Sequence, residues 1–374
     1  MKELINKIIY FVFRSLPIIR NKILFIGYYG SQYGCNPKYL SQFFSENDKD
    51  LKIVWTFNQP QKYNLKNIIS IRYYSLRYFY ELATSKVVIS NYRLPEYFKK
   101  RDTQYYIQTW HSSLRLKMIE DDAVNTLPES YVQMAKYDSS QIDLLLSGCK
   151  FSSDIFKRAF WYNGEIFECG TPRCDILFKQ NDSIIKSVKD RLGLNTTDKI
   201  LLYAPTFRKG NDLSAYDIDF KQLLRVLNQQ GVWKILIRLH PHLQDYSTEL
   251  VKNNDFIIDV TKYDDIQELL LISDFLISDY SSLVFDYAIT KKPCILYTSD
   301  LEEYLKKDRN LYFNIKELPF PICFNNNELI ETIKSFDFEE YINALNQFDL
   351  KIGSFEDGYA CQRVYEKIIS YIKS

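Results

Sequence analysis

The chain contains only three histidines, and two of them directly follow segments that resemble β-strands. His111 ends the run Tyr105-Tyr-Ile-Gln-Thr-Trp-His111, and His240 ends the run Lys234-Ile-Leu-Ile-Arg-Leu-His240, with His242 just beyond it. Ligands of doubly wound sheets bind beyond the carboxyl ends of the strands. Histidine is the usual side chain for proton transfer near neutral pH. Each ring alone could simply cap a strand, but the matching placement favours catalysis and predicts that both rings point into one cleft.

Two other segments carry groups that suit a diphosphate. Ser281 and Ser282 precede a helical run as good N-cap residues, and a helix start offers N–H groups and a positive dipole end to phosphate. Arg208 follows another strand, where a guanidinium could bind a diphosphate. An ordinary N-cap and a solvated loop arginine are the structural alternatives. The predicted phosphate-binding residues are Thr206, Arg208, Arg238, Ser278, Asp279, Ser281 and Ser282.

The run Gly27–Gly34 forms a glycine-rich loop after the first predicted strand. Its spacing does not match the dinucleotide fingerprint, which disfavours NAD. The sequence also lacks a P-loop, a nucleophile elbow and a carboxylate cluster with the spacing of metal ligands. We therefore expect neither a cofactor nor a metal. Gly30, Ser112 and Ser113 are predicted to lie in loops of the site.

Composition narrows the class of protein. With 374 residues, 46% of them hydrophobic and 25% charged, the chain is globular and long enough for two domains. The 48 basic and 47 acidic residues give a net charge of +1, which argues against a nucleic-acid-binding protein. Seven cysteines without regular spacing argue against a disulfide framework and a zinc site, and indicate a reducing cytoplasm.

Short apolar runs alternate with helical patterns along most of the chain, which predicts parallel sheets with crossover helices. The predicted strands are Lys22–Gly27, Lys52–Phe57, Asn67–Ile71, Lys86–Ser90, Tyr105–Thr109, Asp143–Ser147, Ile166–Cys169, Ile200–Ala204, Lys234–Leu239, Phe256–Val260, Phe275–Ser278 and Cys294–Tyr297. The fold class is therefore α/β, with two doubly wound Rossmann-like domains facing a cleft. We place the two domains at 22–185 and 186–374, with the last helix packing back on the first domain.

Residues 1–21 form an amphipathic segment. Its apolar face comprises Ile5, Ile8, Ile9, Val12 and Leu16, and its basic residues are Lys2, Lys7, Arg14 and Arg20, followed by Lys22. The apolar run Ile8–Phe13 is too short to span a bilayer, and no signal-peptide cleavage site follows it. Such a helix can lie in the membrane interface or pack on its own domain. The two interpretations are equally consistent with the pattern.

Taken in order, these segments resemble the CDP-glycerol glycerophosphotransferase family of teichoic-acid and capsule enzymes, from about residue 22 to residue 370. The matching runs are Gly30–Lys38, Gln108–His111, Gly170–Asp175, Tyr203–Arg208, Arg238–Pro241, Ser278–Ser282, Asp300–Tyr304 and Asp357–Gly358 with Arg363. The family's Gly-Thr after Trp-His is Ser112-Ser113 here, so serine stands where glycine would allow the closest backbone approach.

The resemblance implies a GT-B-like fold, CDP-glycerol or CDP-ribitol as donor, CMP as product and a polyprenyl-diphosphate-linked acceptor. It also implies a location on the inner face of the cell membrane. His111 and His240 would line the site, with Ser281, Ser282 and Arg208 near the donor phosphates. The domain at 22–185 would be the acceptor side, with Gly30, Ser112 and Ser113 in its loops, and the domain at 186–374 would bind the CDP-linked donor.

We hypothesise that an acceptor hydroxyl attacks the alditol-bearing phosphorus in line. His111 would be the general base and His240 would stabilise the leaving group, although the two roles could be exchanged. Two other classes stay open, because fold does not fix function. One is a glycosyltransferase of the same architecture, and the other is an inactive partner that binds donor or acceptor.

Overall fold

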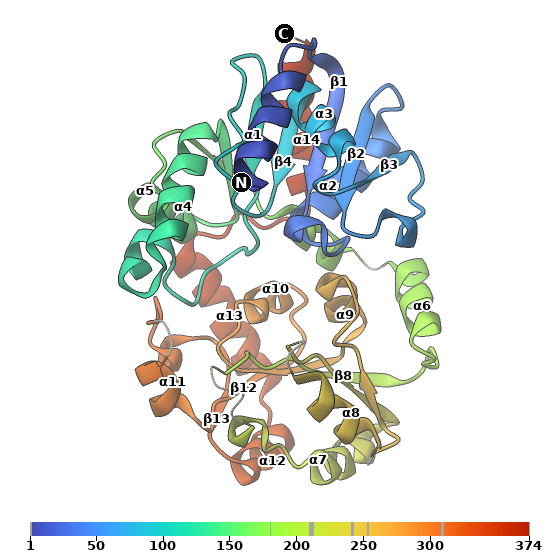
Figure 1. Ribbon diagram of the computed structural model, residues 1–374. Coiled ribbons are helices and arrows are strands. Elements are labelled where there is room, and N and C mark those ends of the chain that lie inside the picture. The colour runs from blue at the N-terminus through green and yellow to red at the C-terminus, as the bar shows by residue number, and fades with distance from the viewer. Residues whose placement is uncertain are drawn as a thin grey trace. The chain divides into compact units, whose positions relative to one another are not determined.

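The computed structural model describes residues 2–179, 181–208, 213–240, 243–252, 254–307 and 310–373, so His242 lies outside the described residues. The chain divides into two compact units (Figure 1). The first consists of residues 1–113, 119–175 and 354–374. The second consists of residues 114–118 and 176–353.

The first unit is built on a seven-stranded parallel sheet with the order β3-β2-β1-β4-β5-β6-β7. Its strands are β1 (Ile19–Ile26), β2 (Lys52–Phe57), β3 (Ile68–Arg72), β4 (Ser85–Ser90), β5 (Tyr105–Gln108), β6 (Leu144–Ser147) and β7 (Glu165–Glu168). Its helices are α1 (Lys2–Phe13), α2 (Cys35–Asn47), α3 (Leu76–Thr84), α4 (Glu129–Gln141), α5 (Lys150–Ala159) and α14 (Ala360–Lys373). The central strands β1 and β4 contain the buried apolar runs Ile23–Ile26 and Val87–Ile89, because helices cover both faces of such a sheet.

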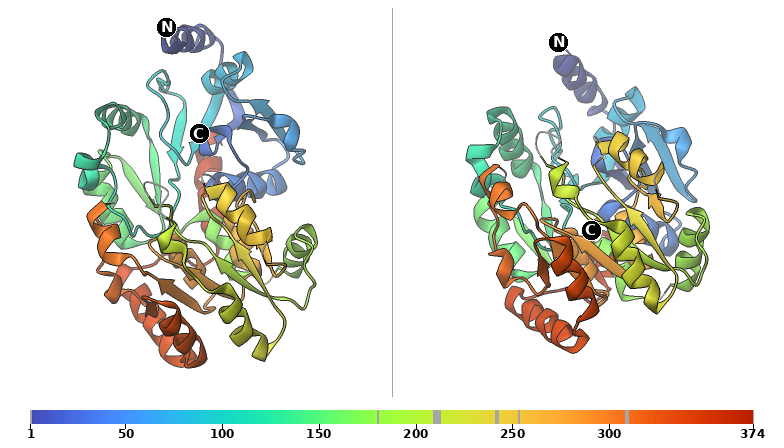
Figure 2. Two further views of the ribbon diagram at one scale, coloured as in Figure 1. Left: turned by 60° about the horizontal axis from the view of Figure 1, so that its bottom comes forward. Right: turned by 90° about the horizontal axis from the view of Figure 1, so that it is seen from below.

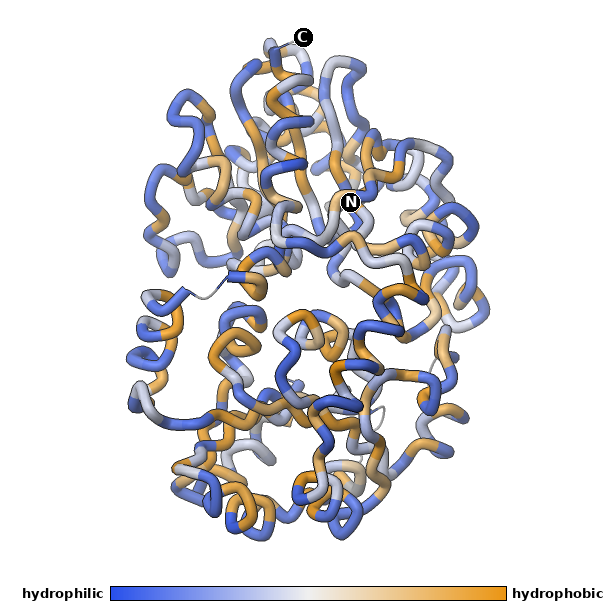
Figure 3. The backbone as a smooth tube through the Cα atoms, turned by 180° about the vertical axis from the view of Figure 1, so that it is seen from behind, coloured by the Kyte–Doolittle hydropathy of each residue, from blue (hydrophilic) through white to orange (hydrophobic). Residues whose placement is uncertain are grey.

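The second unit repeats this design with a six-stranded parallel sheet in the order β10-β9-β8-β11-β12-β13. Its strands are β8 (Lys199–Tyr203), β9 (Trp233–Ile237), β10 (Ile257–Asp259), β11 (Phe275–Ser278), β12 (Cys294–Tyr297) and β13 (Ile322–Cys323). Its helices are α6 (Asp182–Arg191), α7 (Phe220–Leu227), α8 (Gln244–Lys252), α9 (Ile266–Ile272), α10 (Leu283–Ala288), α11 (Leu301–Lys307), α12 (Asn326–Lys334) and α13 (Phe338–Ile352). Hydrophobic residues gather inside each unit and hydrophilic residues follow the outer loops (Figure 3).

Every predicted strand is present, with ends that differ by a few residues, and the prediction of two doubly wound α/β folds is confirmed. β13 was missed, because two residues leave almost no pattern. The division between the units falls at 175/176, before α6, whereas the prediction of 185/186 would cut that helix. α6 packs against α9 and so belongs to the second unit. α14 returns to the first unit and packs against α2.

Helix α1 docks on α3 at the periphery of the first unit (Figure 2). Tyr10 is fully buried and its hydroxyl donates to the carbonyl of Lys99 at 2.9 Å. The ring of Phe13 meets Tyr80 edge to face at 5.9 Å. The opposite side of the helix leaves an apolar stripe exposed, formed by Leu4, Ile5, Ile8, Phe11 and Val12. The helix therefore packs on its own domain with one face and keeps most of the predicted apolar face accessible.

Candidate active site

In the first unit, His111 lies beyond the carboxyl end of β5, next to the loops that follow β4 and β1. These three strands are neighbours in the order β1-β4-β5, and the strand order reverses between β1 and β4. Loops diverge at such a reversal and leave room for a ligand. The sheet thus places His111 at the edge where doubly wound folds bind their substrates.

The ring of half-buried His111 is held in one orientation. Its Nδ1 lies 3.1 Å from the carbonyl oxygen of Asn91, which can only accept a hydrogen bond. Nδ1 therefore carries the proton of the neutral ring, and Nε2 is its basic nitrogen. Tyr92 stacks parallel to the imidazole, with 5.0 Å between ring centroids and 7° between planes. A ring with a fixed tautomer and a basic Nε2 is suited to accept a proton from a hydroxyl group.

Backbone strain accumulates in the loops around this histidine. Trp110, Tyr28 and Tyr29 have φ angles of 50°, 48° and 51°. Positive φ is rare for bulky side chains and costs on the order of 1–3 kcal/mol per residue. The rings of Tyr28 and Tyr29 both contact Tyr92, at 5.3 Å and 4.9 Å. Such strain persists only where the surroundings enforce it, which is typical of functional sites.

The residues predicted for the acceptor side are structurally constrained. Gly30 has φ +80°, and a Cβ atom there would lie 3.1 Å from the backbone nitrogen of Asn58. Ser112 and Ser113 are buried, and the carbonyl of Ser113 accepts from the hydroxyl of Ser152 at 2.9 Å. Within the described residues, the Ser112 hydroxyl oxygen is buried without a hydrogen-bond partner. A role toward the acceptor stays a prediction for all three.

In the second unit, Arg208 is buried and paired with two carboxylates. Its Nε and Nη2 donate to Asp300 at 2.6 Å and 3.0 Å, and Nη2 lies 2.8 Å from Asp279. Nη1 donates to the carbonyl of Thr206 at 2.6 Å, and Tyr280 and Tyr304 flank the guanidinium. Burial alone would lower the pKa of Arg208, but the two carboxylates raise it above its ordinary value. The structural alternative of a solvated loop arginine is wrong, because the guanidinium is buried and paired with Asp279 and Asp300. Contact of Arg208 with a donor diphosphate stays a prediction.

Asp279 and Ser278 fix the loop that follows β8. Both carboxylate oxygens of Asp279 accept the N–H of Thr206, at 2.8 Å and 3.0 Å. The hydroxyl of Ser278 donates to the carbonyl of Ala204 at 2.7 Å. Both side chains are buried. They therefore connect β8 with β11 at the reversal of the second sheet, and contact with the donor stays a prediction.

Ser281 and Ser282 precede α10, which is only six residues long. The Ser281 hydroxyl accepts the N–H of Leu283 at 3.4 Å, whereas Ser282 makes no side-chain capping bond. Ser282 instead accepts the N–H of Leu116 at 3.2 Å. Ser282 thus occupies the predicted N-cap position, but its hydroxyl binds the 114–118 segment and not the start of the helix. Contact of Ser281 and Ser282 with a phosphate stays a prediction.

His240 and Arg238 follow β9 on the same edge of the second sheet. His240 is exposed, and its ring lies 4.5 Å from that of Phe207. Nη1 of Arg238 donates to the carbonyls of Tyr263 and Val260, at 2.5 Å and 3.3 Å. The two predicted residues thus differ: His240 is accessible to a ligand, whereas Arg238 supports the loop after β10.

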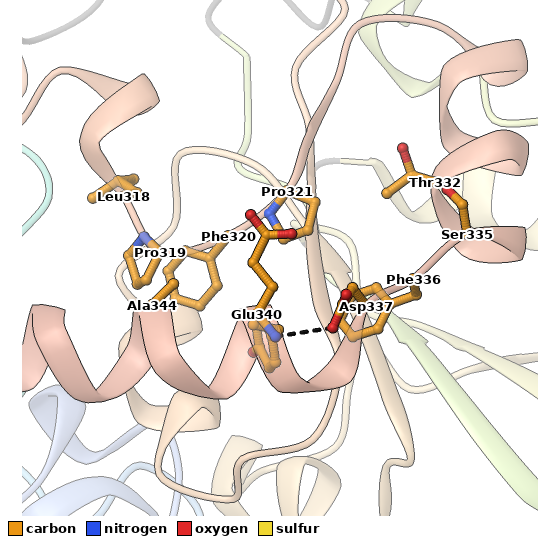
Figure 4. Close-up of a pocket in the computed structure, with 11 residues that line it drawn as sticks. Leu318, Pro319, Phe320, Pro321, Thr332, Ser335, Phe336, Asp337, Glu340 and Ala344 are labelled. Atoms are coloured by element: carbon orange, nitrogen blue, oxygen red, sulfur yellow. Dashed lines mark hydrogen bonds between the residues drawn. The ribbon is translucent and has the colours of Figure 1, made fainter.

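Two cavities lie at opposite edges of the second sheet. One, of about 650 Å³, is lined by Thr298 and Asp300 beyond the carboxyl end of β12, with Asp217 and Lys316. The other, of about 400 Å³, is formed by residues that precede β13 and by α12 and α13 (Figure 4). Because it lies at the amino end of β13, the second cavity is not part of the predicted donor site.

Several residues of the site received no role from sequence reasoning. Asn36 and Arg173 bond the backbone beside His111, Gln108 holds Trp110, and Asp300 pairs with Arg208. All four lie in runs that carry the family resemblance. Their position in these runs could have marked the four residues as candidates for the site. The runs alone do not show which groups each residue contacts.

Comparison with known proteins places this chain among cell-envelope enzymes. It is 34% identical to the teichoic acid glycerol-phosphate transferase of Staphylococcus aureus, over 98% of both chains. It is 32% identical to the teichoic acid poly(glycerol phosphate) polymerase of Bacillus subtilis, over 98% of this chain and 51% of that protein.

A solved structure shows the same likeness. The wall teichoic acid polymerase TagF, in a variant soaked with CDPG, aligns with a TM-score of 0.87 and 30% identity, over 98% of this chain and 93% of that chain. The GT-B-like fold is therefore shown. Residues 8–370 match the model of one family, and the chain belongs to that family, CDP-Glycerol:Poly(glycerophosphate) glycerophosphotransferase.

Proposed function

We propose that this chain transfers glycerol phosphate from CDP-glycerol to a teichoic-acid type polymer and releases CMP. The observation that supports this most strongly is the family match over residues 8–370. The relatives' names specify glycerol phosphate as the transferred group. For the acceptor, we propose a growing polymer linked to a polyprenyl diphosphate.

The proposed reaction is an in-line displacement at the phosphorus that bears glycerol. Nε2 of His111 takes the proton of the acceptor hydroxyl, while the Nδ1–H bond to Asn91 keeps the ring in place. His240 stabilises the diphosphate oxygens that become CMP, together with N–H groups near Ser281 and Ser282. Such a transfer depends on positioning and charge stabilisation more than on covalent catalysis.

Arg208 has a different part in this proposal. Asp279 and Asp300 already neutralise its guanidinium. We therefore propose that Arg208 fixes the loop after β8 and does not bind the phosphates directly. Thr206 lies in that loop, and its N–H is fixed by Asp279. The loop can then present its backbone to the donor without rearranging.

A donor panel tests the proposed activity. The purified chain is incubated with a lipid-linked acceptor and CDP-glycerol, CDP-ribitol or a UDP-sugar, and the released nucleotide is measured together with the product mass. We expect CMP from CDP-glycerol only when acceptor is present, and a product heavier by glycerol phosphate units. Release of UDP from a UDP-sugar would indicate a glycosyltransferase. Donor binding without CMP release from any acceptor would indicate an inactive partner.

We also propose that α1 holds the protein at the cytoplasmic face of the membrane. No helix among the described residues is both long and apolar enough to cross a bilayer. The exposed stripe with Ile5, Ile8 and Val12 suits the membrane interface, and Lys7 is exposed on the same helix. Acidic lipids would attract the basic residues of this segment.

Replacing Ile8 and Val12 with glutamate should weaken binding to vesicles of acidic phospholipid by about tenfold or more, since each buried apolar side chain contributes roughly 1.5–3 kcal/mol. Co-sedimentation with vesicles measures the effect. Leu350→Glu is the matched control, because Leu350 is an exposed leucine of α13 in the other unit. Equal sedimentation of the double variant and the native chain would exclude α1 as the membrane contact.

A further inference from the structure

Two buried side chains from distant parts of the chain bind three consecutive carbonyl groups beside His111. Nδ2 of Asn36 donates to the carbonyls of Thr109 and Trp110, at 3.0 Å and 3.2 Å. Nη1 of Arg173 donates to the carbonyl of His111 at 2.7 Å. Asn36 and Arg173 are only 1% and 6% exposed, so water does not compete for these bonds.

The two side chains are also joined to each other. Oδ1 of Asn36 accepts the backbone N–H of Arg173 at 3.1 Å, and Nη1 of Arg173 contacts Sγ of Cys35 at 3.3 Å. Asn36 stands in the first turn of α2, whereas Arg173 follows β7. The start of α2 and the 172–175 turn thus form one bonded unit around residues 109–111, which we call the Asn36–Arg173 clamp.

The backbone held by the clamp is strained. Trp110 has φ +50°, and its N–H donates to Oε1 of Gln108 at 3.0 Å, while Nε2 of Gln108 donates to the carbonyl of Tyr92. A tryptophan in this conformation would relax to a commoner one unless its peptide groups were held. The orientation of the next residue, His111, depends on this peptide.

We propose that Asn36 and Arg173 are positioning residues that keep His111 in its proton-accepting orientation, an inference that depends on the proposed function. Without the clamp, Trp110 would relax and the bond from Nδ1 of His111 to Asn91 would lengthen. Misplacing a reacting group by about 1 Å can cost on the order of 100-fold in rate. Donor binding would be spared, because the proposed donor contacts come from the second unit.

The experiment compares Asn36→Ala, Arg173→Ala and the conservative Arg173→Lys with matched controls. Asn47→Ala removes an asparagine of the same helix whose Nδ2 also bonds a carbonyl, and Arg158→Ala removes an exposed arginine of the same unit. We expect the clamp variants to lower kcat by roughly 10- to 100-fold, with the KM for CDP-glycerol nearly unchanged. Arg173→Lys should fall between Arg173→Ala and the native chain, and the controls should match the native chain.

A double-mutant cycle shows whether the clamp acts through the histidine. In a His111→Ala background, Asn36→Ala should cost less than about threefold, because the group that it positions is gone. An undiminished loss in that background would overturn the inference. If Asn36→Ala does not fold, Asn36→Ser and Arg173→Lys serve in the same cycle.

Nitrogen NMR of the imidazoles separates this inference from the proposed function. The native chain should show His111 protonated at Nδ1, and the clamp variants should show a mixture of tautomers. If His111→Ala keeps native turnover while the clamp variants show a mixture of His111 tautomers, His111 is not the base. The clamp would then still position the ring of His111. Native kcat together with the native tautomer in the clamp variants would refute the clamp.

Discussion

Replacing His111 with alanine is expected to lower kcat by about 100- to 10,000-fold, the range that a general base typically contributes. The acceptor hydroxyl must lose its proton as it attacks, and the fixed tautomer of His111 supplies Nε2 for that step. The ring is only half-buried, so its loss should leave the fold intact. The affinity for CDP-glycerol should stay near its native value.

Single-turnover measurement of CMP release gives the chemical step, and calorimetry with CDP-glycerol gives the affinity. His240→Ala is the informative companion, because the exposed ring of His240 is proposed to act on the leaving group. We expect His240→Ala to lower the rate as well. Added imidazole should restore part of the activity of His111→Ala, which lacks the base, and not that of His240→Ala. Near-native turnover of His111→Ala would show that His111 is not the general base.

The elements that carry these histidines could be predicted because local pattern determines them. β9 and β5 each contain a short run of buried apolar residues, Ile235–Ile237 and Tyr106–Ile107, which is typical of a buried parallel strand. A histidine directly after such a run must then lie at the carboxyl edge of the sheet. The placement of His111 and His240 at their sheet edges needed no knowledge of long-range contacts.

The surroundings of these residues could not be predicted, because they depend on partners far away in sequence. Asp300 is 92 residues from Arg208, and His111 is 62 residues from Arg173. No local pattern shows that a loop arginine will be buried between two carboxylates. The short α10 shows the same limit, since Ser282 stands at its N-cap position but its hydroxyl accepts the N–H of Leu116, which is 166 residues away.

The burial of Arg208 leads to the second large effect. Arg208→Met should lower the free energy of unfolding of the second unit by roughly 3–5 kcal/mol, the usual cost of breaking a buried ion pair. Methionine replaces the side-chain volume but leaves buried Asp279 and half-buried Asp300 without their cation. Both carboxylates would then face unfavourable burial, and the loop after β8 would lose its anchor.

Urea unfolding followed by hydrogen exchange in the second unit measures this loss. The matched control is Arg191→Met, since Arg191 is 52% exposed, pairs with Glu268 in the same unit and should contribute less than about 1 kcal/mol. Arg208→Met combined with Asp300→Asn should recover part of the stability, because one of the two unpaired charges is removed. If the guanidinium mainly bound donor phosphate, the ligand-free variant would unfold like the native chain and only its affinity for CDP-glycerol would fall. That pattern would indicate that Arg208 binds the donor directly. A large loss of stability without ligand would instead show that Arg208 anchors the loop after β8.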